Sequence, residues 1–368
     1  MDFDLNEDQV ALREGARDLL EGLASPAQVR VVVEAGGGID ARLWSAMAAQ
    51  GWPAVMRAES TDGLGMGPVE VAVLLEEIGR VGAPAPFAST VLAIDALDSG
   101  GATDLADRVL VDVGVGPALG CVAWSRDPAA VRAEATGRSG SWMLHGRPDP
   151  APYAPSATVA VVTAVTDDGP ALFAIDLAAV GRPERESAMD RTRELSWIHL
   201  DTTPAVRLGG ADAVDRLVDL GAVFACAEML GGANRVLELA VDYAKDRVQF
   251  GRPVGSFQAV KHRCADMLVD VEGMRSSTYW AAWCLGAGDR ESSIAASTAK
   301  IWCADASKRV MASALQVHGG IGFTWEHDLH LFMKRAQLDQ LSFGDAPFHR
   351  DRLASLLRTR VEAGEGVL

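Results

Sequence analysis

The feature that most constrains the fold is a break between two long helical patterns, at residues 243–262. Before the break, residues 212–246 predict a single helix roughly 50 Å long at 1.5 Å per residue. After it, apolar side chains recur at helical spacing through residues 257–274. Pro253 cannot continue a helix, and Gly251 permits a tight turn between the two. Two long helices joined by so short a link predict an antiparallel helical bundle.

The rest of the chain shows helical patterning on both sides of a β-rich middle. Further helices are predicted at residues 40–50, 68–81, 89–97, 328–341 and 347–360. Strands are predicted at residues 158–165, 171–175, 196–201 and 205–208. The predicted fold class is therefore α+β, mainly α, with an N-terminal helical domain (1–118), a middle antiparallel β-domain (119–208) and a C-terminal four-helix bundle (209–368).

Composition narrows the function classes. The chain has 368 residues, of which 49% are hydrophobic, enough for a large core. Its formal charge of −16 disfavours a nucleic-acid partner, because phosphates require a basic surface. No apolar run approaches a membrane span and no basic-then-apolar leader follows Met1, so we expect a cytoplasmic protein without membrane insertion. Five widely spaced cysteines without a C-x-x-C pair indicate reduced thiols.

Polar side chains gather at the break between the long helices. Arg247, Gln249 and Gln258 all lie within it. An arginine beside helix-terminal backbone donors suits a phosphate or pyrophosphate. The alternative is an ordinary turn with a solvated arginine, and these residues alone favour that alternative. The glycine-rich run at residues 63–67 is not a dinucleotide fingerprint, because no strand precedes it and its spacing is wrong.

Two motifs carry a resemblance to a known family. The string Arg247-Val248-Gln249-Phe250-Gly251, followed by Phe257-Gln258 and Lys261, resembles the R-x-x-F-G…F-Q…K segment of acyl-CoA dehydrogenases. The string from Gln316 to Phe323, QVHGGIGF, resembles their Q-x-x-G-G-x-G-[FY] segment. The resemblance extends over nearly the whole chain and is weakest between about residues 119 and 205.

The resemblance implies an FAD shared across a subunit interface. In this family one subunit holds the isoalloxazine ring and the acyl chain, and its neighbour reaches over with the two motifs to the pyrophosphate and adenosine. The reaching half is retained here. It assigns cofactor binding to Arg247, Gln249, Phe250, Phe257, Gln258, Gln316, Gly319 and Gly320. Without the first motif, residues 319–322 read as an ordinary helix C-terminal turn.

The half that holds the flavin ring departs from the family pattern. Residues 121–128, CVAWSRDP, stand where the family has an E-P-x-x-G-S-D-like loop. Residues 146–153, GRPDPAPY, stand where it has W-I-[ST]. Prolines in this stretch remove backbone N–H donors that a flavin ring requires. Whether Asp127 or Tyr153 rebuilds a ring pocket is left open by the sequence.

The catalytic carboxylate is also missing. The family carries its glutamate late in the chain, in Y-E-G-[TS], where this sequence has Phe343. The family's other location aligns with Gly221. Asp219 is turned to the opposite helix face and Glu228 lies about 10 Å further along the axis, so both are poor substitutes. No catalytic residue is therefore assigned. His327 and His330 beside Glu326 indicate packing rather than a metal site, and no metal is expected.

Together these motifs imply the non-catalytic subunit of a heteromeric acyl-CoA dehydrogenase. The resemblance is to the actinobacterial α2β2 enzymes that desaturate steroid side-chain CoA thioesters. The catalytic partner would bind most of the acyl-CoA, and an electron-transfer flavoprotein or similar acceptor would reoxidise the FAD. One alternative is a homomeric enzyme that uses Asp219 or Glu228 as base. The other is a flavin-free scaffold protein with the same fold.

Overall fold

The computed structural model describes residues 4–110, 119–136, 141–364 and 366. It divides into two compact units. The bundle unit comprises Met1–Gln28, Pro68–Ala83 and Ala222–Leu368, and the sheet unit comprises Val29–Gly67 and Pro84–Gly221. The predicted fold class, mainly helical with a central sheet domain, is confirmed. The domain limits predicted from the sequence stay a prediction.

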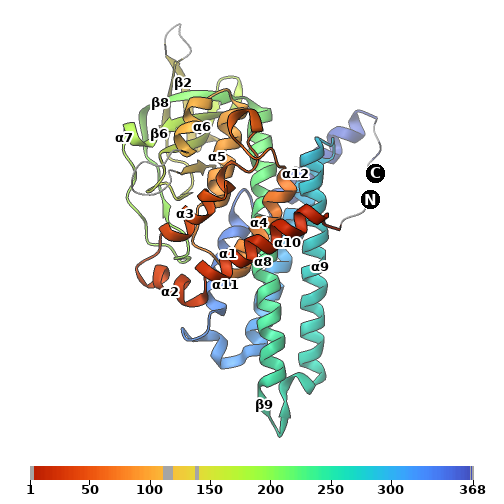
Figure 1. The fold of residues 1–368 in the computed structure, drawn as a ribbon. Coiled ribbons are helices and arrows are strands. Elements are labelled where there is room, and N and C mark those ends of the chain that lie inside the picture. Colours follow the sequence, from red (N-terminus) through yellow and green to blue (C-terminus); the bar gives the residue numbers. More distant parts are fainter. Residues whose placement is uncertain (1–3, 111–118, 137–140, 365, 367–368) are drawn as a thin grey trace. The chain divides into compact units, whose positions relative to one another are not determined.

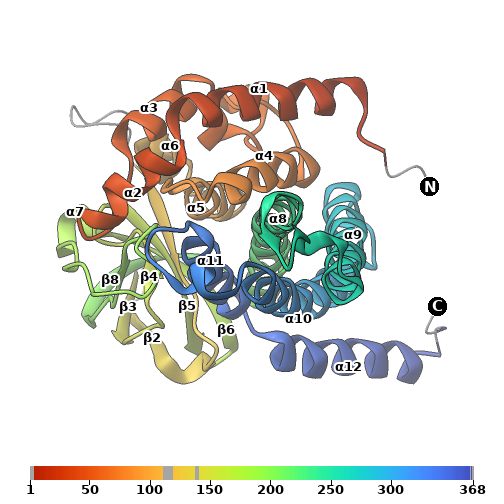
Figure 2. The ribbon, with the colours of Figure 1, turned by 90° about the horizontal axis from the view of Figure 1, so that it is seen from below.

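The bundle unit is built on three long helices that lie side by side (Figures 1 and 2). They are α8 (Ala211–Asp246), which belongs to this unit from Ala222 onward, α9 (Gln258–Ala287) and α10 (Ser292–His318). The shorter helices of this unit are α1 (Glu7–Leu23), α4 (Pro68–Val81), α11 (Leu329–Leu341) and α12 (Ala346–Glu362). Small residues fill one side of α10, where Ala295, Ala299, Ala306 and Ala314 are fully buried. The predicted helices at 212–246, 328–341 and 347–360 agree with the observed ones to within two residues.

Two glycines bring α4 and α8 into backbone contact. A Cβ added at Gly231 of α8 would lie 1.8 Å from the carbonyl oxygen of Glu76. A Cβ added at Gly79 of α4 would lie 2.1 Å from the carbonyl oxygen of Glu228. Each helix therefore requires glycine where the other crosses it, because backbone atoms cannot move aside as a side chain can.

The sheet unit contains four longer helices and a sheet of six strands. The helices are α2 (Pro26–Glu34), α3 (Ala41–Ala49), α5 (Phe87–Ser99) and α6 (Thr103–Leu110), with the short α7 (Leu177–Val180). The strands are β1 (Gly120–Ala123), β2 (Val131–Thr136), β3 (Ser141–Gly146), β5 (Val159–Thr166), β6 (Gly169–Asp176) and β8 (Leu200–Gly209). Their order is β1-β5-β2-β3-β8-β6, and β6 also pairs with β5, so the pairings close on themselves. Separately, β4 (Ala151–Pro152) pairs with β7 (Leu195–Ser196).

Two details of the sheet correct the sequence analysis. The sheet was predicted to be antiparallel, but β5 pairs in parallel with β1 and, at one position, with β2. Between β1 and β5 the chain forms the antiparallel pair of β2 and β3. It then enters β5 in the same direction as β1, so these two strands are parallel. Residues 196–201 and 205–208 were predicted as two strands, but residues 197–199 lie outside any strand, and 200–209 form the single strand β8, which is interrupted by an irregularity. There Thr202 has a φ of +52°, opposite the register shift in β3.

The glycine-rich run at 63–67 has a packing role. A Cβ at Gly63 would lie 2.2 Å from the carbonyl oxygen of Arg57, so the loop lies directly against that residue. Arg57 is itself buried and pairs with Asp98 and Asp107 at 2.9 and 2.6 Å. This run is therefore built around an internal ion-pair cluster. None of the described helices is long and apolar enough to cross a membrane.

Candidate functional site

A short β-hairpin with a two-residue turn connects α8 to α9. β9 (Val248–Gln249) pairs with β10 (Arg252–Pro253), and Phe250 and Gly251 form the turn. Both turn residues have positive φ, +52° at Phe250 and +77° at Gly251, as a primed hairpin turn requires. The sequence had indicated only a tight turn. Figure 1 shows this hairpin at the end of α8 and α9.

The hairpin presents its functional candidates to solvent. Phe250 is 91% exposed and holds a left-handed backbone conformation that disfavours bulky residues. Arg247 and Gln249 are exposed as well. Among the residues that the structure describes, no carboxylate pairs with the Arg247 guanidinium. Arg247 and Phe250 are therefore close in the sequence and both exposed. An exposed aromatic ring near a cation, at a turn with an unusual backbone conformation, is typical of binding surfaces.

Phe257 and Gln258 lie at the start of α9, next to the hairpin. Phe257 is half-buried and packs edge-on against Phe250, with ring centroids 6.1 Å apart. The guanidinium of Arg252 lies 4.1 Å above the ring of Phe257. Gln258 is the first residue of α9 and is exposed. The structure therefore brings together all five candidates from the first motif.

The second motif lies at the end of α10. Gln316 is exposed in the last turn, and Gly319 ends the helix with a φ of +62°, which explains the glycine there. At Gly320 no atom of the chain lies within 4 Å of an added Cβ. Packing among the described residues therefore does not require glycine at 320.

An aromatic stack joins the bases of the two motifs. The ring of Tyr243, one helical turn before Arg247, stacks on the ring of His318 with centroids 4.9 Å apart. His318 immediately precedes Gly319. The sequence analysis did not single out either ring, although His318 lies inside the second motif.

Comparison with protein families agrees with this geometry. The model described as "Acyl-CoA dehydrogenase, N-terminal domain" matches residues 6–116, and "Acyl-CoA dehydrogenase, C-terminal domain" matches residues 209–357. Together they cover more than half of the chain. The chain belongs to the acyl-CoA dehydrogenase family. The resemblance stated from the two motifs is thereby confirmed.

Relatives within this family span nearly the full chain. Acyl-CoA dehydrogenase IpdE2 of Mycolicibacterium smegmatis is 33% identical over 90% of this chain and 93% of its own length. Among solved structures, a variant of the Tcur3481-Tcur3483 steroid ACAD is 30% identical, with a TM-score of 0.88 over 97% of this chain and 99% of the other. The ChsE4-ChsE5 complex from Mycobacterium tuberculosis is 28% identical, with the same TM-score and coverage.

The segments that align with the flavin-ring half of the family's site form hydrogen bonds within this chain. Tyr153 is buried, and its hydroxyl donates a hydrogen bond to the carbonyl of Ala85 at 3.0 Å. Asp127 accepts a hydrogen bond from the backbone N–H of Ala129 at 2.9 Å and caps a short 3₁₀ turn. The Tyr153 hydroxyl is therefore engaged within the chain, whereas Asp127 is exposed and uses one carboxylate oxygen as a cap.

Phe343 lies in a loop that buried polar side chains hold through main-chain carbonyls. Lys300, fully buried, donates hydrogen bonds to the carbonyls of Asp339 and Ser342, each at 2.7 Å. His349, also fully buried, lies 2.9 Å from the carbonyl oxygen of Phe343 and donates to it through Nε2. Burial lowers the pKa of Lys300 to about 8. Phe343 itself has a φ of +54° and no group that can accept a proton.

Both alternative carboxylates are buried. Glu228 is 4% exposed and forms a buried ion pair with Arg335, which also donates to the carbonyl of Ala83 at 3.0 Å. Separating such a pair leaves an uncompensated buried charge, so Glu228 is committed to Arg335. Asp219 is 3% exposed, within the buried middle of α8.

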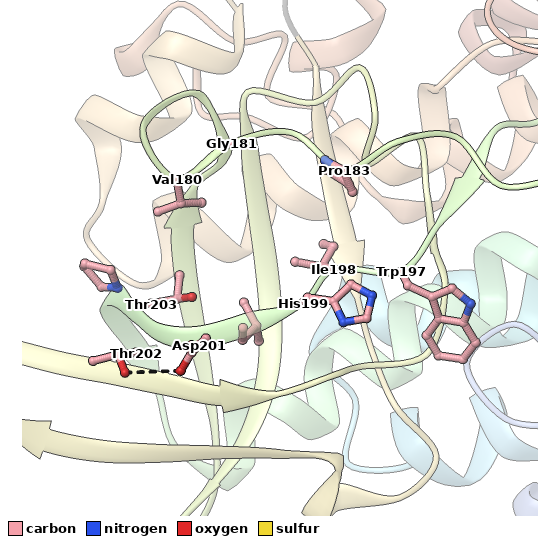
Figure 3. A pocket seen from close by; sticks show the side chains of 11 residues that line it. Val180, Gly181, Pro183, Trp197, Ile198, His199, Asp201, Thr202 and Thr203 are labelled. Carbon is pink, nitrogen blue, oxygen red and sulfur yellow. Dashed lines mark hydrogen bonds between the residues drawn. The ribbon is translucent and has the colours of Figure 1, made fainter.

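Other kinds of site were sought among the residues that the structure describes. Among the described residues, no group of three or more His, Cys, Asp or Glu side chains is arranged to hold a metal ion. A hollow of about 320 Å³ lies beside β8 in the sheet unit, lined in part by Trp197, His199 and Asp201 (Figure 3). None of the residues predicted to bind the cofactor lines it.

His349 gives the fold a specific acid sensitivity. Burial lowers its pKa to about 3, the nearby charge of Lys300 adds to this, and the hydrogen bond to Phe343 opposes it. In the unfolded chain its pKa is near 6.5, so the unfolded state binds more protons between about pH 3 and 6.5. The free energy of unfolding should therefore decrease as the pH is lowered through this window, and at pH 5 the decrease is about 2 kcal/mol.

Urea unfolding at pH 7 and pH 5 measures this contribution. His349→Gln keeps a donor for the carbonyl of Phe343 but does not titrate. We expect the variant to lose about 2 kcal/mol less than the native protein between the two pH values. Equal losses would show that His349 does not carry the acid sensitivity.

Proposed function

We propose that this chain is the non-catalytic subunit of a heteromeric, FAD-dependent acyl-CoA dehydrogenase. The observation that carries the proposal is a division within one chain. Arg247 and Phe250 are both exposed on the hairpin, where Phe250 contacts only the edge of Phe257 in a ring–ring contact among the described residues, whereas the position of the family's catalytic base is occupied by Phe343. Random loss of function gives no reason for one half of a site to persist while the other disappears.

The retained residues fit the nucleotide half of FAD. Arg247, exposed and without a carboxylate partner among the described residues, suits a pyrophosphate that accepts bidentate hydrogen bonds. Phe250 and Phe257 offer apolar rings, and Gln258 and Gln316 offer amides. Gly319 and Gly320 allow close approach of a ligand to the backbone. When bound, FAD supplies the hydride acceptor for desaturation of the acyl chain, while this chain orients its nucleotide end.

A partner subunit would supply the base, the flavin-ring pocket and the acyl cavity. Two similar solved structures are described as a steroid ACAD and as a ChsE4-ChsE5 complex. They support an α2β2 assembly and a steroid CoA thioester as the substrate class. An electron-transfer flavoprotein or a similar acceptor would then take the electrons.

The visible absorption spectrum tests this proposal. The chain is purified alone, and again after co-expression with a candidate catalytic acyl-CoA dehydrogenase subunit from the same organism. We expect flavin absorbance only in the co-purified complex, at one FAD per pair of subunits. A lone chain that is stoichiometrically yellow and is bleached by an acyl-CoA would instead support the homomeric alternative. A complex without flavin would support the scaffold alternative.

A further inference from the structure

The aromatic stack at the base of the two motifs has a defined geometry. The ring of His318 lies between two others in the bundle unit. On one side it stacks on Tyr243 of α8, at 4.9 Å between centroids and 27° between planes. On the other side it meets His327 edge-on, at 4.5 Å and 62°. His318 is 2% exposed, so these contacts form its immediate surroundings.

Hydrogen bonding fixes the orientation of the central ring. Nδ1 of His318 lies 2.8 Å from the carbonyl oxygen of Ala314, and since a carbonyl only accepts, Nδ1 carries the proton. Nε2 is then an acceptor, and no described residue donates to it. The backbone N–H of Leu329 donates to Nδ1 of His327, so that ring is also held in one orientation. An unsatisfied buried acceptor is uncommon and calls for a reason to keep histidine at this position.

Tyr243 and His318 each lie next to a segment that carries predicted cofactor-binding residues. The carbonyl of Tyr243 accepts a hydrogen bond from the N–H of Arg247 at 2.9 Å, and the carbonyl of Arg247 accepts one from the N–H of Val254 at 2.7 Å. These two bonds tie the β9–β10 hairpin to the last turn of α8. On the other side, His318 is bonded to Gly319, where the chain leaves α10 with a positive φ.

We propose that His318 is a positioning residue that couples the β9–β10 hairpin to the turn at Gly319 and Gly320. The ring of His318 holds Tyr243, and Tyr243 fixes the helical turn from which Arg247 projects. The hydrogen bond to Ala314 fixes the plane of the ring on which Tyr243 stacks. The two segments therefore move as one element rather than as two independent loops. The coupling stands on the chain alone, and its effect on FAD rests on the proposed function.

Two substitutions separate the two features of His318. His318→Phe keeps a ring to stack on Tyr243 but loses the hydrogen bond to Ala314. His318→Asn keeps a donor near the position of Nδ1 but removes the ring. Hydrogen–deuterium exchange of the purified chain then reports the amides of Arg247 and Val254. We expect about tenfold faster exchange at these amides in His318→Asn and less than threefold in His318→Phe, because the stack carries the coupling.

A control removes a ring contact elsewhere in the same unit. His330 of α11 packs against Trp325 at 4.6 Å between centroids, so His330→Ala should leave exchange in the hairpin unchanged. Unchanged exchange in His318→Asn would overturn the coupling. An equal increase throughout α8, α9 and α10 would also overturn it, since it would mark general loosening of the bundle.

The effect on the cofactor is measured separately, in the co-purified complex. The dissociation constant of FAD should rise at least tenfold in His318→Asn and less than threefold in His318→Phe. In an Arg247→Ala background, His318→Asn should have less than threefold further effect, because the group that it positions is gone. Independent, multiplicative effects would contradict the coupling. A complex without FAD would remove the proposed function but leave the exchange result standing.

Discussion

Replacing Arg247 with alanine is expected to release FAD from the heteromeric complex. A guanidinium that makes two charge-assisted hydrogen bonds to a pyrophosphate contributes about 3–4 kcal/mol, or a hundred- to thousandfold in affinity. The variant complex should therefore purify without flavin absorbance at dilutions where the native complex remains yellow. Arg247 is exposed and makes no ion pair among the described residues, so the variant should fold normally.

Arg252 provides the matched control. It is exposed in the same hairpin, but its guanidinium lies 4.1 Å above the ring of Phe257 within the chain. Arg252→Ala should weaken FAD less than about tenfold, since a cation–π contact of this kind contributes about 1 kcal/mol. Arg247→Lys should lie between the two, because lysine keeps the charge and loses the planar fork. Full flavin retention and normal turnover in Arg247→Ala would remove the role assigned to this residue.

Replacing Gly231 with alanine is expected to be the most damaging small substitution in the bundle unit. The added methyl would lie 1.8 Å from the carbonyl oxygen of Glu76, so α4 and α8 would have to separate. Overpacking against backbone costs about 3 kcal/mol or more, which exceeds the gain of about 1 kcal/mol in helix propensity. We expect a large fall in the melting temperature, or an insoluble protein.

The adjacent glycine offers a control in the same helical turn. A Cβ at Gly232 would lie 3.6 Å from the nearest backbone oxygen and 3.8 Å from Phe332, which are ordinary contact distances. Gly232→Ala should therefore be neutral or stabilise the protein by up to about 1 kcal/mol. Thermal unfolding of the two variants checks the difference. Similar melting temperatures would contradict the close backbone contact at Gly231.

Sequence patterning was sufficient for much of the helical framework and less so for the connections. The helix α8 and the first half of α9 followed from apolar spacing, whereas α10 was not predicted over its full length. The hairpin at Phe250 did not follow from the sequence, because a positive φ at a phenylalanine has no signature in composition. The parallel pairing of β1 with β5 was missed because pairing direction depends on the path of the intervening chain, which local patterns do not record.

The candidate residues within the two motifs could be named from the sequence. The contacts that packing creates around them could not. Arg247 and Gln316 followed from the resemblance alone. The stack of Tyr243 on His318 is a contact between distant segments of the chain, so no local pattern announces it. The commitment of Glu228 to Arg335 likewise becomes visible only when two helices are placed side by side.

The way in which the loop at Phe343 is held has a consequence for how such subunits can differ. Lys300 and His349 hold this loop by hydrogen bonds to its main-chain carbonyls. Any residue at position 343 that can adopt the backbone conformation of Phe343 would keep these bonds. The side chain at position 343 can therefore be exchanged for another while α11 and α12 keep their connection. Folding then places little constraint on the chemistry at this position, and a pair of subunits can divide catalysis and cofactor binding between them.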